Sequence, residues 1–279
     1  MQSQKQNFLV TGLFLLIAAA QAWKHQSFVT EPFNPPVFNV TKSGEALAPG
    51  YILLTTTGDP NPASVIMTDE GELVWSSPTG PYTNLQIATV GGEQVLAFWN
   101  GTDSPPIATT GHGWGNVQML DSTYTPVYNV CPQVNVFAPL GKSYPCQGDL
   151  HESYITDHGT IVVSAYNATP YDLTSVGGPS DGYVLDGLFF EIDIKTQDIL
   201  FSWSALASGI PVNDTFQELG PGTAGNPFDY FHVNSIQGLD DGYLVNSRHM
   251  WSTYKINKSG QIEWQLQVSI HTHYSREGH

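Results

Sequence analysis

Two histidines and one arginine of this sequence could act together in catalysis or in binding an anion. His151 and His232 each stand at the polar start of a segment that continues as an apolar run, a glycine turn and a second apolar run. Arg248, one of only two arginines, lies near the end of the second segment. A planar guanidinium beside imidazoles suits a tetrahedral oxyanion such as sulfate or phosphate. We therefore treat His151, His232 and Arg248 as candidate catalytic residues. The alternatives are histidines that satisfy buried backbone groups and an arginine in a surface ion pair.

Residues close to these three supply further candidates. Asn234 stands two residues after the second histidine and could hydrogen-bond a ligand there. Tyr166 could form an aromatic wall of a substrate site or pack in the core. We expect His249 to face away from Arg248, because side chains alternate along a strand. His112 lies in the stretch GHGWG and could reach a ligand or only shape a turn.

The sequence contains none of the common motifs that bind nucleotides or catalytic zinc, such as G-x-x-x-x-G-K-[ST], G-x-G-x-x-G and H-E-x-x-H. His271, His273 and His279 are better interpreted as a solvated tail than as a metal site. We therefore predict no cofactor and no metal. The formal net charge of −16 disfavours nucleic acid as a partner, since no basic patch is available to neutralise phosphates.

Short apolar runs separated by turn residues predict an all-β chain, and internal repeats organise these runs. Three segments share the pattern of polar start, strand, glycine turn and strand: Asn84–Trp99, His151–Tyr166 and His232–His249. A second hairpin pattern, in which Asp or Asn starts the turn and Trp ends the last strand, occurs at Val65–Trp75, Leu188–Trp203 and Thr253–Leu266. Met119–Val130 is a degenerate copy of it.

Four strands per repeat with aromatic residues at fixed places are typical of a β-propeller blade. The first strand of a blade lines the central channel, so His151 and His232 could point at one axial site. The chain is long enough for about three to four such blades, whereas closed propellers usually have four to eight. We therefore predict an incomplete β-propeller over residues 50–279, preceded by an extended segment at 23–49.

The N-terminus has the features of a secretory signal peptide over residues 1–22. A lysine precedes the apolar run Phe8–Ala20, and Ala20-Gln21-Ala22 forms an A-x-A cleavage site. The run is shorter than the ~20 residues that span a bilayer, which disfavours a membrane anchor. Five N-x-S/T sequons, which are acceptors for N-glycosylation, agree with export: Asn39, Asn100, Asn167, Asn213 and Asn257.

The two cysteines, Cys131 and Cys146, also fit an oxidising compartment. They are fifteen residues apart and no C-x-x-C motif is present, so a disulfide is favoured over a redox or metal role. Such a crosslink contributes roughly 3 kcal/mol by loop-closure arguments. We therefore predict a secreted, disulfide-bonded glycoprotein.

The stretches DLHESYIT, FDYFHVNSI and DGYLVNSRHMWSTYKINKSGQIEW resemble the arylsulfotransferase family, in particular its secreted fungal branch. The similarity extends from about Gly50 to Leu266. The resemblance implies a six-bladed propeller that moves a sulfuryl group from an aryl sulfate to a phenol, without a nucleotide donor, through a transient sulfohistidine.

Carried over by position, His151 and His232 match two channel histidines of the family and Arg248 matches its sulfate-binding arginine. The nucleophilic histidine of the family lies in a later blade and has no match here, so we expect a C-terminally truncated chain that could be inactive. The alternative is a non-catalytic extracellular propeller that binds a glycan or another ligand. A quinone-dependent dehydrogenase is a weaker alternative, because nothing specifies a cofactor site.

Overall fold

The computed structural model describes residues 34–45, 47–57, 60–103, 111–136 and 144–267. The predicted signal peptide and the three terminal histidines lie outside these residues. The described chain folds into consecutive antiparallel sheets, and its helical structure is confined to short 3-10 turns, η3 (Thr174–Val176) and η4 (Val212–Asp214). None of the described helices is long and apolar enough to cross a membrane. The predicted all-β class is therefore confirmed.

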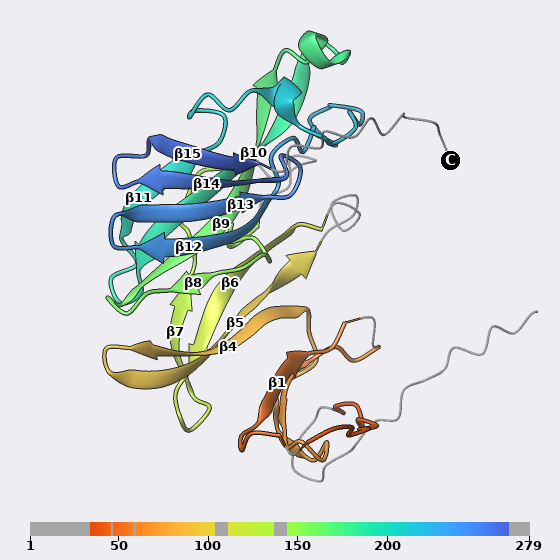
Figure 1. Cartoon of the computed structure of the whole chain (residues 1–279), viewed down its shortest axis with the longest axis vertical. Coiled ribbons are helices and arrows are strands. Elements are labelled where there is room, and N and C mark those ends of the chain that lie inside the picture. The colour runs from red at the N-terminus through yellow and green to blue at the C-terminus, as the bar shows by residue number, and fades with distance from the viewer. Residues whose placement is uncertain (1–33, 46, 58–59, 104–110, 137–143, 268–279) are drawn as a thin grey trace, which may run out of the picture.

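The strands form one three-stranded and three four-stranded sheets (Figure 1). The first contains β1 (Ile52–Thr55), β2 (Ser64–Met67) and β3 (Leu73–Ser76). The second contains β4 (Tyr82–Val90), β5 (Glu93–Asp103), β6 (Gly113–Leu120) and β7 (Pro126–Val130). The third contains β8 (Tyr154–Ile155), β9 (Thr160–Tyr171), β10 (Gly182–Asp193) and β11 (Ile199–Ser204). The fourth contains β12 (Val233–Leu239), β13 (Gly242–Ser247), β14 (Ser252–Asn257) and β15 (Ile262–Gln267).

Within each sheet the strands are neighbours in chain order, which is the meander of a propeller blade. The predicted first hairpins correspond to β4–β5, β8–β9 and β12–β13, and the predicted second hairpins to β2–β3, β10–β11 and β14–β15. The degenerate copy corresponds to the end of β6 and to β7. The sheets therefore agree with the predicted incomplete propeller.

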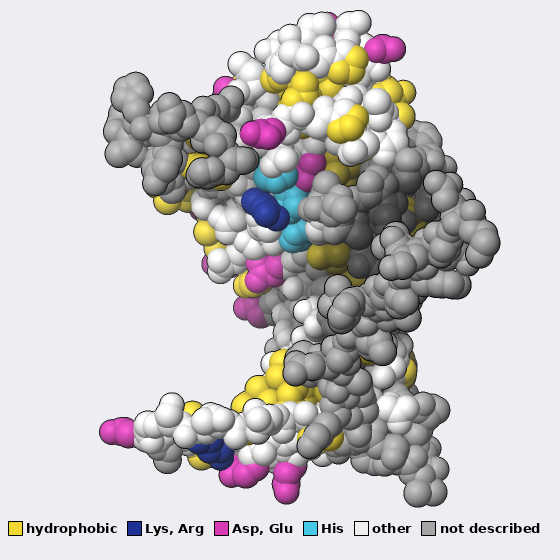
Figure 2. Space-filling model, turned by 90° about the vertical axis from the view of Figure 1, so that its right-hand side faces the viewer, with side chains coloured by type: hydrophobic (Ala, Val, Ile, Leu, Met, Phe, Trp, Pro, Cys, Tyr) yellow, Lys and Arg dark blue, Asp and Glu magenta, His cyan; other side chains and the backbone are white. Residues whose placement is uncertain are grey.

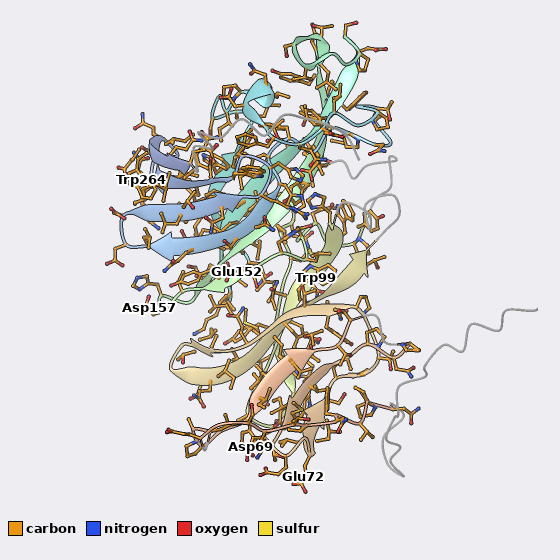
Figure 3. The ribbon with its side chains drawn as sticks, turned by 45° about the vertical axis from the view of Figure 1, so that its right-hand side comes forward. Asp69, Glu72, Trp99, Glu152, Asp157 and Trp264 are labelled. Carbon is orange, nitrogen blue, oxygen red and sulfur yellow. A yellow bond between two sulfur atoms is a disulfide. The ribbon has the colours of Figure 1, made fainter. Side chains whose placement is uncertain are left out.

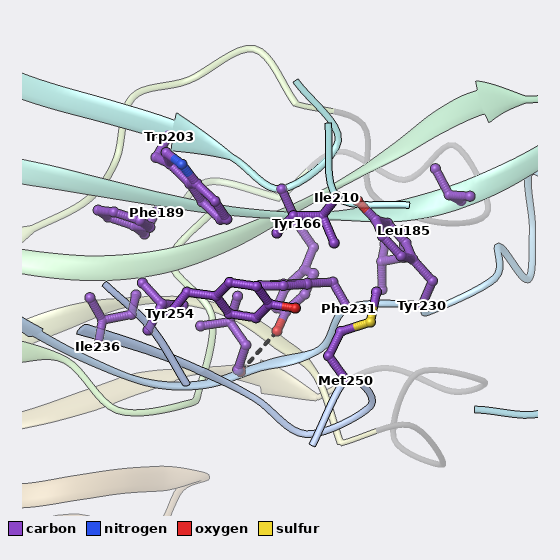
Figure 4. Packing of buried hydrophobic residues seen from close by; sticks show 14 of the residues in the cluster. Tyr166, Leu185, Phe189, Trp203, Ile210, Tyr230, Phe231, Ile236, Met250 and Tyr254 are labelled. Carbon is purple, nitrogen blue, oxygen red and sulfur yellow. Dashed lines mark hydrogen bonds between the residues drawn. The ribbon is translucent and has the colours of Figure 1, made fainter. Parts of the chain in front are cut away.

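Apolar layers between successive sheets hold the blades together. Along β9, Ile161, Val163 and Ala165 belong to the layer shared with the second sheet, whereas Val162 and Tyr166 belong to the layer shared with the fourth. Successive side chains of β9 therefore alternate between the two layers, as expected for a strand that is buried on both faces. The layer between the third and fourth sheets is rich in aromatic residues (Figure 4).

The tryptophans that end the second hairpins do not all fill such a layer. Trp203 is buried at 5% exposure and packs on Phe189 and Phe231. Trp264 on β15 is 47% exposed and lies on the outermost strand of the fourth sheet (Figure 3). Burial of the tryptophan that ends the hairpin therefore holds for Trp203 and not for Trp264.

Candidate active site

The candidate active site is a cluster of four histidines and two aspartates at the ends of strands from three sheets. The side chains come from the residue before β6, the segment before β8, the segment before β12 and the turn after β13: His112, Asp149, His151, Asp229, His232 and His249. Figure 2 shows histidine side chains grouped on one face, with a basic side chain over them and an acidic one beside them. Residues far apart in the sequence therefore meet in one place.

The segment before β12 is fixed by pairing with the third sheet. The Phe228 N–H donates to the carbonyl of Tyr183, and the Leu185 N–H donates to the carbonyl of Phe228. Tyr230 and Phe231 then enter the core with no exposed surface. These hydrogen bonds and the buried rings fix the backbone of the segment. The side chains of Asp229 and His232 then contact each other in the cluster.

His232 adopts a left-handed backbone conformation, with φ at +49°, just before β12. Such a conformation is uncommon for a residue with a side chain and needs support from its surroundings. The hydroxyl of Tyr166 supplies part of this support by donating to the carbonyl of Val233 at 3.0 Å (Figure 4). The Arg248 N–H donates to the carbonyl of His232 itself at 2.9 Å.

His112 reaches the cluster because the glycines beside it allow close packing. A side chain on Gly115 would place Cβ only 2.3 Å from the carbonyl oxygen of Asn100, and one on Gly113 would lie 2.9 Å from Trp99 and Leu150. The fully buried His112 ring packs against Tyr166 with ring centroids 4.0 Å apart. The stretch GHGWG therefore brings its histidine to the cluster.

Asp149 and His151 are tied to the second and third sheets. The Asp149 N–H donates to the carbonyl of Ser164, while Trp99 Nε1 donates to the carbonyl of Gly148 (Figure 3). Oδ1 of Asp149 accepts from the backbone N–H of His151 and lies 2.5 Å from its Nδ1. Oδ2 accepts the Gly113 N–H and lies 3.5 Å from Nδ1 of His112.

Asp229 is the centre of the cluster. Its Oδ2 atom lies 2.6 Å from Nδ1 of His232 and 2.9 Å from Nε2 of His112. Its backbone carbonyl accepts from Nδ1 of His249 at 2.5 Å. One aspartate therefore orients three imidazoles that come from three different loops.

Burial and charge divide the histidines into different protonation states. Burial disfavours the charged form of His112, but Asp229 and Asp149 outweigh it and raise the pKa of His112 to about 9. Burial also disfavours charge on Asp149 and Asp229, but their contacts with the histidines hold the pKa of both carboxyls well below their ordinary range. Burial lowers the pKa of His232 to about 4 against the attraction of Asp229. At neutral pH the cluster contains an imidazolium at His112 and a neutral His232.

His151 and His232 face each other through their remaining nitrogens. Nε2 of His232 lies 3.2 Å from Nε2 of His151, and each ring has its Nδ1 at a carboxylate. His232 is fully buried, whereas the side chain of His151 is 14% exposed. The two candidate histidines predicted from the repeat are thus in direct contact, and His151 is the one that reaches the surface.

Arg248 and His249 lie in the turn after β13, because this strand ends at Ser247. Strand alternation therefore does not apply to them, and the expected placement of Arg248 on the strand is wrong. Arg248 is exposed and its guanidinium has no ion pair among the described side chains. The carbonyl of Asp229 can only accept, so Nδ1 of His249 carries the proton and Nε2 keeps its lone pair.

A known protein family matches the part of the chain that contains this cluster. The model of the arylsulfotransferase (ASST) family matches residues 86–274, which is more than half of the chain. The chain belongs to the arylsulfotransferase family. The matched range contains all six residues of the histidine–aspartate cluster and Arg248. No curated protein matches the sequence.

Two solved structures are similar to this arylsulfotransferase-family chain at low identity. One is a protein of unknown function from Bacteroides caccae, with 14% identity, a TM-score of 0.44 and coverage of 80% of this chain and 59% of that one. The other is the Dos1 propeller, with 10% identity, a TM-score of 0.39 and coverage of 78% and 48%. The chain therefore spans about half to three fifths of the length of these structures.

The remaining predicted residues of the arylsulfotransferase-family chain have different environments. Tyr166 is 1% exposed, and its hydroxyl donates a hydrogen bond to the backbone carbonyl of Val233. Asn234 is half-buried and lines a shallow groove together with Arg248 and Trp251. The predicted disulfide between Cys131 and Cys146 is present, with Cα atoms 5.5 Å apart. Of the sequons, Asn39 and Asn213 are exposed, whereas Asn100, Asn167 and Asn257 are half-buried.

Sequence reasoning missed the two aspartates that organise the site. Asp149 precedes His151 by two residues and Asp229 precedes His232 by three, in segments that the repeat had already aligned. An acidic residue shortly before the histidine in both segments was the available signal. The contribution of His249 could not be foreseen, because it depends on where β13 ends.

Proposed function

We propose that this chain binds an aryl sulfate and takes part in sulfuryl transfer to a phenol. The observation that carries the proposal is the position of Arg248, a cation without an acidic partner among the described residues, in the turn that also supplies His249 to the cluster. In a protein of net charge −16 an available guanidinium is the natural contact for an anionic sulfate. Family membership supports the same class of substrate.

His249 is our candidate for the residue that accepts the sulfuryl group. Burial lowers its pKa, against the attraction of Asp229, and the charge of Arg248 lowers it further. The ring is therefore neutral at pH 7, and its Nε2 lone pair has no hydrogen-bond partner among the described residues. A neutral imidazole held in one orientation is a suitable nucleophile. This assignment replaces the expectation that the nucleophile lies only in a later blade.

The proposed reaction has two displacements at sulfur. The Nε2 lone pair attacks sulfur while the bond from sulfur to the aryl oxygen breaks, and the phenolate leaves with the electron pair and takes a proton from solvent. A phenol then loses its proton to solvent and its oxygen attacks the sulfohistidine, so that the N–S bond breaks and the imidazole is restored. Positioning and charge stabilisation are the main contributions that such a transfer needs from the protein. Arg248, Asn234, His151 and His232 are proposed to supply them.

The test is sulfate transfer from 4-nitrophenyl sulfate to phenol by the full chain, with the covalent state followed by mass spectrometry. We expect release of 4-nitrophenol and a sulfuryl adduct on the peptide that contains His249. Arg248→Ala is expected to weaken binding of the donor, and His249→Ala to abolish the adduct while binding persists. His158→Ala is the control, because this side chain is 73% exposed and its one ion pair within the described part of the chain is with Asp157. Absence of both binding and transfer in the unmodified chain would refute the proposal.

A second candidate function is binding of a glycan without catalysis. A groove beside the first and second sheets is lined by Trp75, Tyr82, Phe98 and Tyr124, and the rings of Trp75 and Tyr124 stack with centroids 5.3 Å apart. Aromatic faces of this kind can pack against sugar rings. Binding of an oligosaccharide that is lost in Trp75→Ala and kept in His249→Ala would favour this function.

We also propose that the chain is exported and glycosylated. The disulfide and the lack of a membrane-spanning helix in the described residues are compatible with an extracellular location. Asn39 and Asn213 are the sequons most open to an oligosaccharide transferase, because both side chains are exposed. Expression in a secreting eukaryotic host, followed by enzymatic removal of N-glycans, is expected to reduce the mass of the protein found in the medium. Asn39→Gln with Asn213→Gln should remove most of this change.

A further inference from the structure

We propose that His112, His151 and His232 form a binding site for a divalent transition-metal ion of the zinc class. The proposal concerns metal binding alone and does not rest on sulfuryl transfer. One ring nitrogen of each histidine lies within 4.8 Å of one from each of the others. Three histidines with a further open position are a common ligand set for zinc in proteins.

The first argument is the way in which the carboxylates hold the rings. Nε2 of His112 contacts Asp229, Nδ1 of His151 contacts Asp149 and Nδ1 of His232 contacts Asp229. The other nitrogen of His151 and of His232 contacts no carboxylate, and the other nitrogen of His112 lies 3.5 Å from Asp149. Metal-ligating histidines almost always donate their second N–H to a carboxylate or carbonyl, which fixes the ring and increases its basicity. The cluster has this arrangement for all three rings.

The second argument is the contact between the two nitrogens left over on His151 and His232. With both Nδ1 atoms donating to carboxylates, both Nε2 atoms carry lone pairs, yet they lie only 3.2 Å apart. Two lone pairs at this distance repel unless a cation lies between them, either a shared proton or a metal ion. Two nitrogens bound to one tetrahedral zinc at about 2.0–2.1 Å are separated by about 3.3 Å. The observed separation therefore suits a shared metal ion.

Nδ1 of His112 is the third candidate ligand. Nδ1 of His112 is buried without a hydrogen-bond partner among the described atoms, which is rare for a buried polar atom. It lies 3.5 Å from Asp149, longer than a good hydrogen bond. Coordination of a metal ion would satisfy this atom.

The charge of the buried cluster also favours an added cation. Asp149 and Asp229 carry two negative charges at 4% and 5% exposure, and neither pairs with a lysine or arginine among the described residues. The charged or ionisable side chains that contact them in the described part of the chain are histidines. Buried carboxylates without full compensation are costly. A divalent ion held by neutral imidazoles would compensate both carboxylates and would leave an open position for water or an anion.

Titration of the chelator-stripped full chain, without a histidine tag, by Co²⁺ and then Zn²⁺ tests the proposal. We expect uptake of one Co²⁺ with the visible absorption bands of tetrahedral coordination, and displacement of that ion by Zn²⁺. His151→Ala and His232→Ala should remove these bands. Asp149→Asn should weaken binding by roughly 10–100-fold, the usual effect of losing an outer-shell partner. His158→Ala should bind as the unmodified chain does.

Two outcomes would overturn the metal site. The first is a folded, stripped chain that gives no tetrahedral Co²⁺ spectrum. The second is a spectrum that persists in His151→Ala, which would place the ion elsewhere, for example at the terminal histidines. Because His232 is fully buried and its replacement could unfold the chain, the decisive variant is His151→Ala, whose side chain is partly exposed. Circular dichroism of each variant separates loss of the site from loss of the fold.

Discussion

Asp229 and His232, three residues apart in the chain, are joined by a contact of 2.6 Å between Oδ2 and Nδ1. The same oxygen lies 2.9 Å from Nε2 of His112, which directly precedes β6 of a different sheet. A carboxylate in this position links the loop before β6 to the loop before β12. The site and the packing of the sheets therefore depend on the same side chain.

Asp229→Asn is expected to lower the free energy of unfolding by about 3 kcal/mol, the lower end of the cost of breaking a buried ion pair. The amide keeps the volume of the side chain but removes the charge that balances the His112 imidazolium. Chemical denaturation followed by tryptophan fluorescence would measure the loss. Asp157→Asn is the matched control, because this side chain is 90% exposed at a hairpin tip (Figure 3) and its replacement should change stability by less than about 0.5 kcal/mol. Equal effects of the two variants would contradict the role given to Asp229.

The shifted pKa values predict that the metal-free chain is most stable near pH 6.5. The pKa of His112 is raised from an unfolded value of 6.5 to about 9, so its stabilisation is complete below pH 6.5 and is lost as the pH rises toward 9. The pKa of His232 is lowered to about 4, so the unfolded chain binds the extra proton between pH 6.5 and 4 and stability falls with acid. The lowered pKa values of Asp149 and Asp229 add to this loss at lower pH.

Melting temperatures across pH 4–10 in the presence of a chelator would show this maximum. In His112→Gln the decline above neutral pH should disappear, while the decline in acid should remain. A wild-type profile that stays level between pH 6.5 and 9 would contradict a charged His112.

The strands could be predicted from the sequence because their signals are local. Alternating apolar residues and turn glycines locate β8–β9 and β12–β13, and the repeat relates His151 to His232. The site was only partly predictable because its contacts join residues from different sheets. The backbone of His232 at positive φ and the end of β13 at Ser247 decide which side chains meet, and neither follows from a period of two. For this reason the sequence pattern predicts Arg248 on the strand and does not reveal the two aspartates.

Gly115→Ala is expected to destabilise the second sheet and to move His112 out of the site. The added Cβ would lie 2.3 Å from the carbonyl oxygen of Asn100, and backbone cannot yield as a flexible side chain can. Overpacking of this kind costs about 1–3 kcal/mol. Gly220→Ala is the control, since a Cβ there meets no atom within 4 Å and φ is not positive. A thermal shift assay should show a lower melting temperature only for Gly115→Ala, and an unchanged value would disprove the close approach.

Removal of the disulfide should weaken both the fold and the order of the site. Cys131 directly follows β7, and Cys146 stands three residues before Asp149, so the crosslink restrains the segment that supplies this carboxylate. Cys131→Ser with Cys146→Ser should reduce the free energy of unfolding by about 3 kcal/mol, because the unfolded chain gains the freedom of the open loop. The reduced wild-type chain should unfold at the same denaturant concentration as this double variant. If the oxidised chain and the double variant unfold together, the crosslink does not stabilise the segment before Asp149.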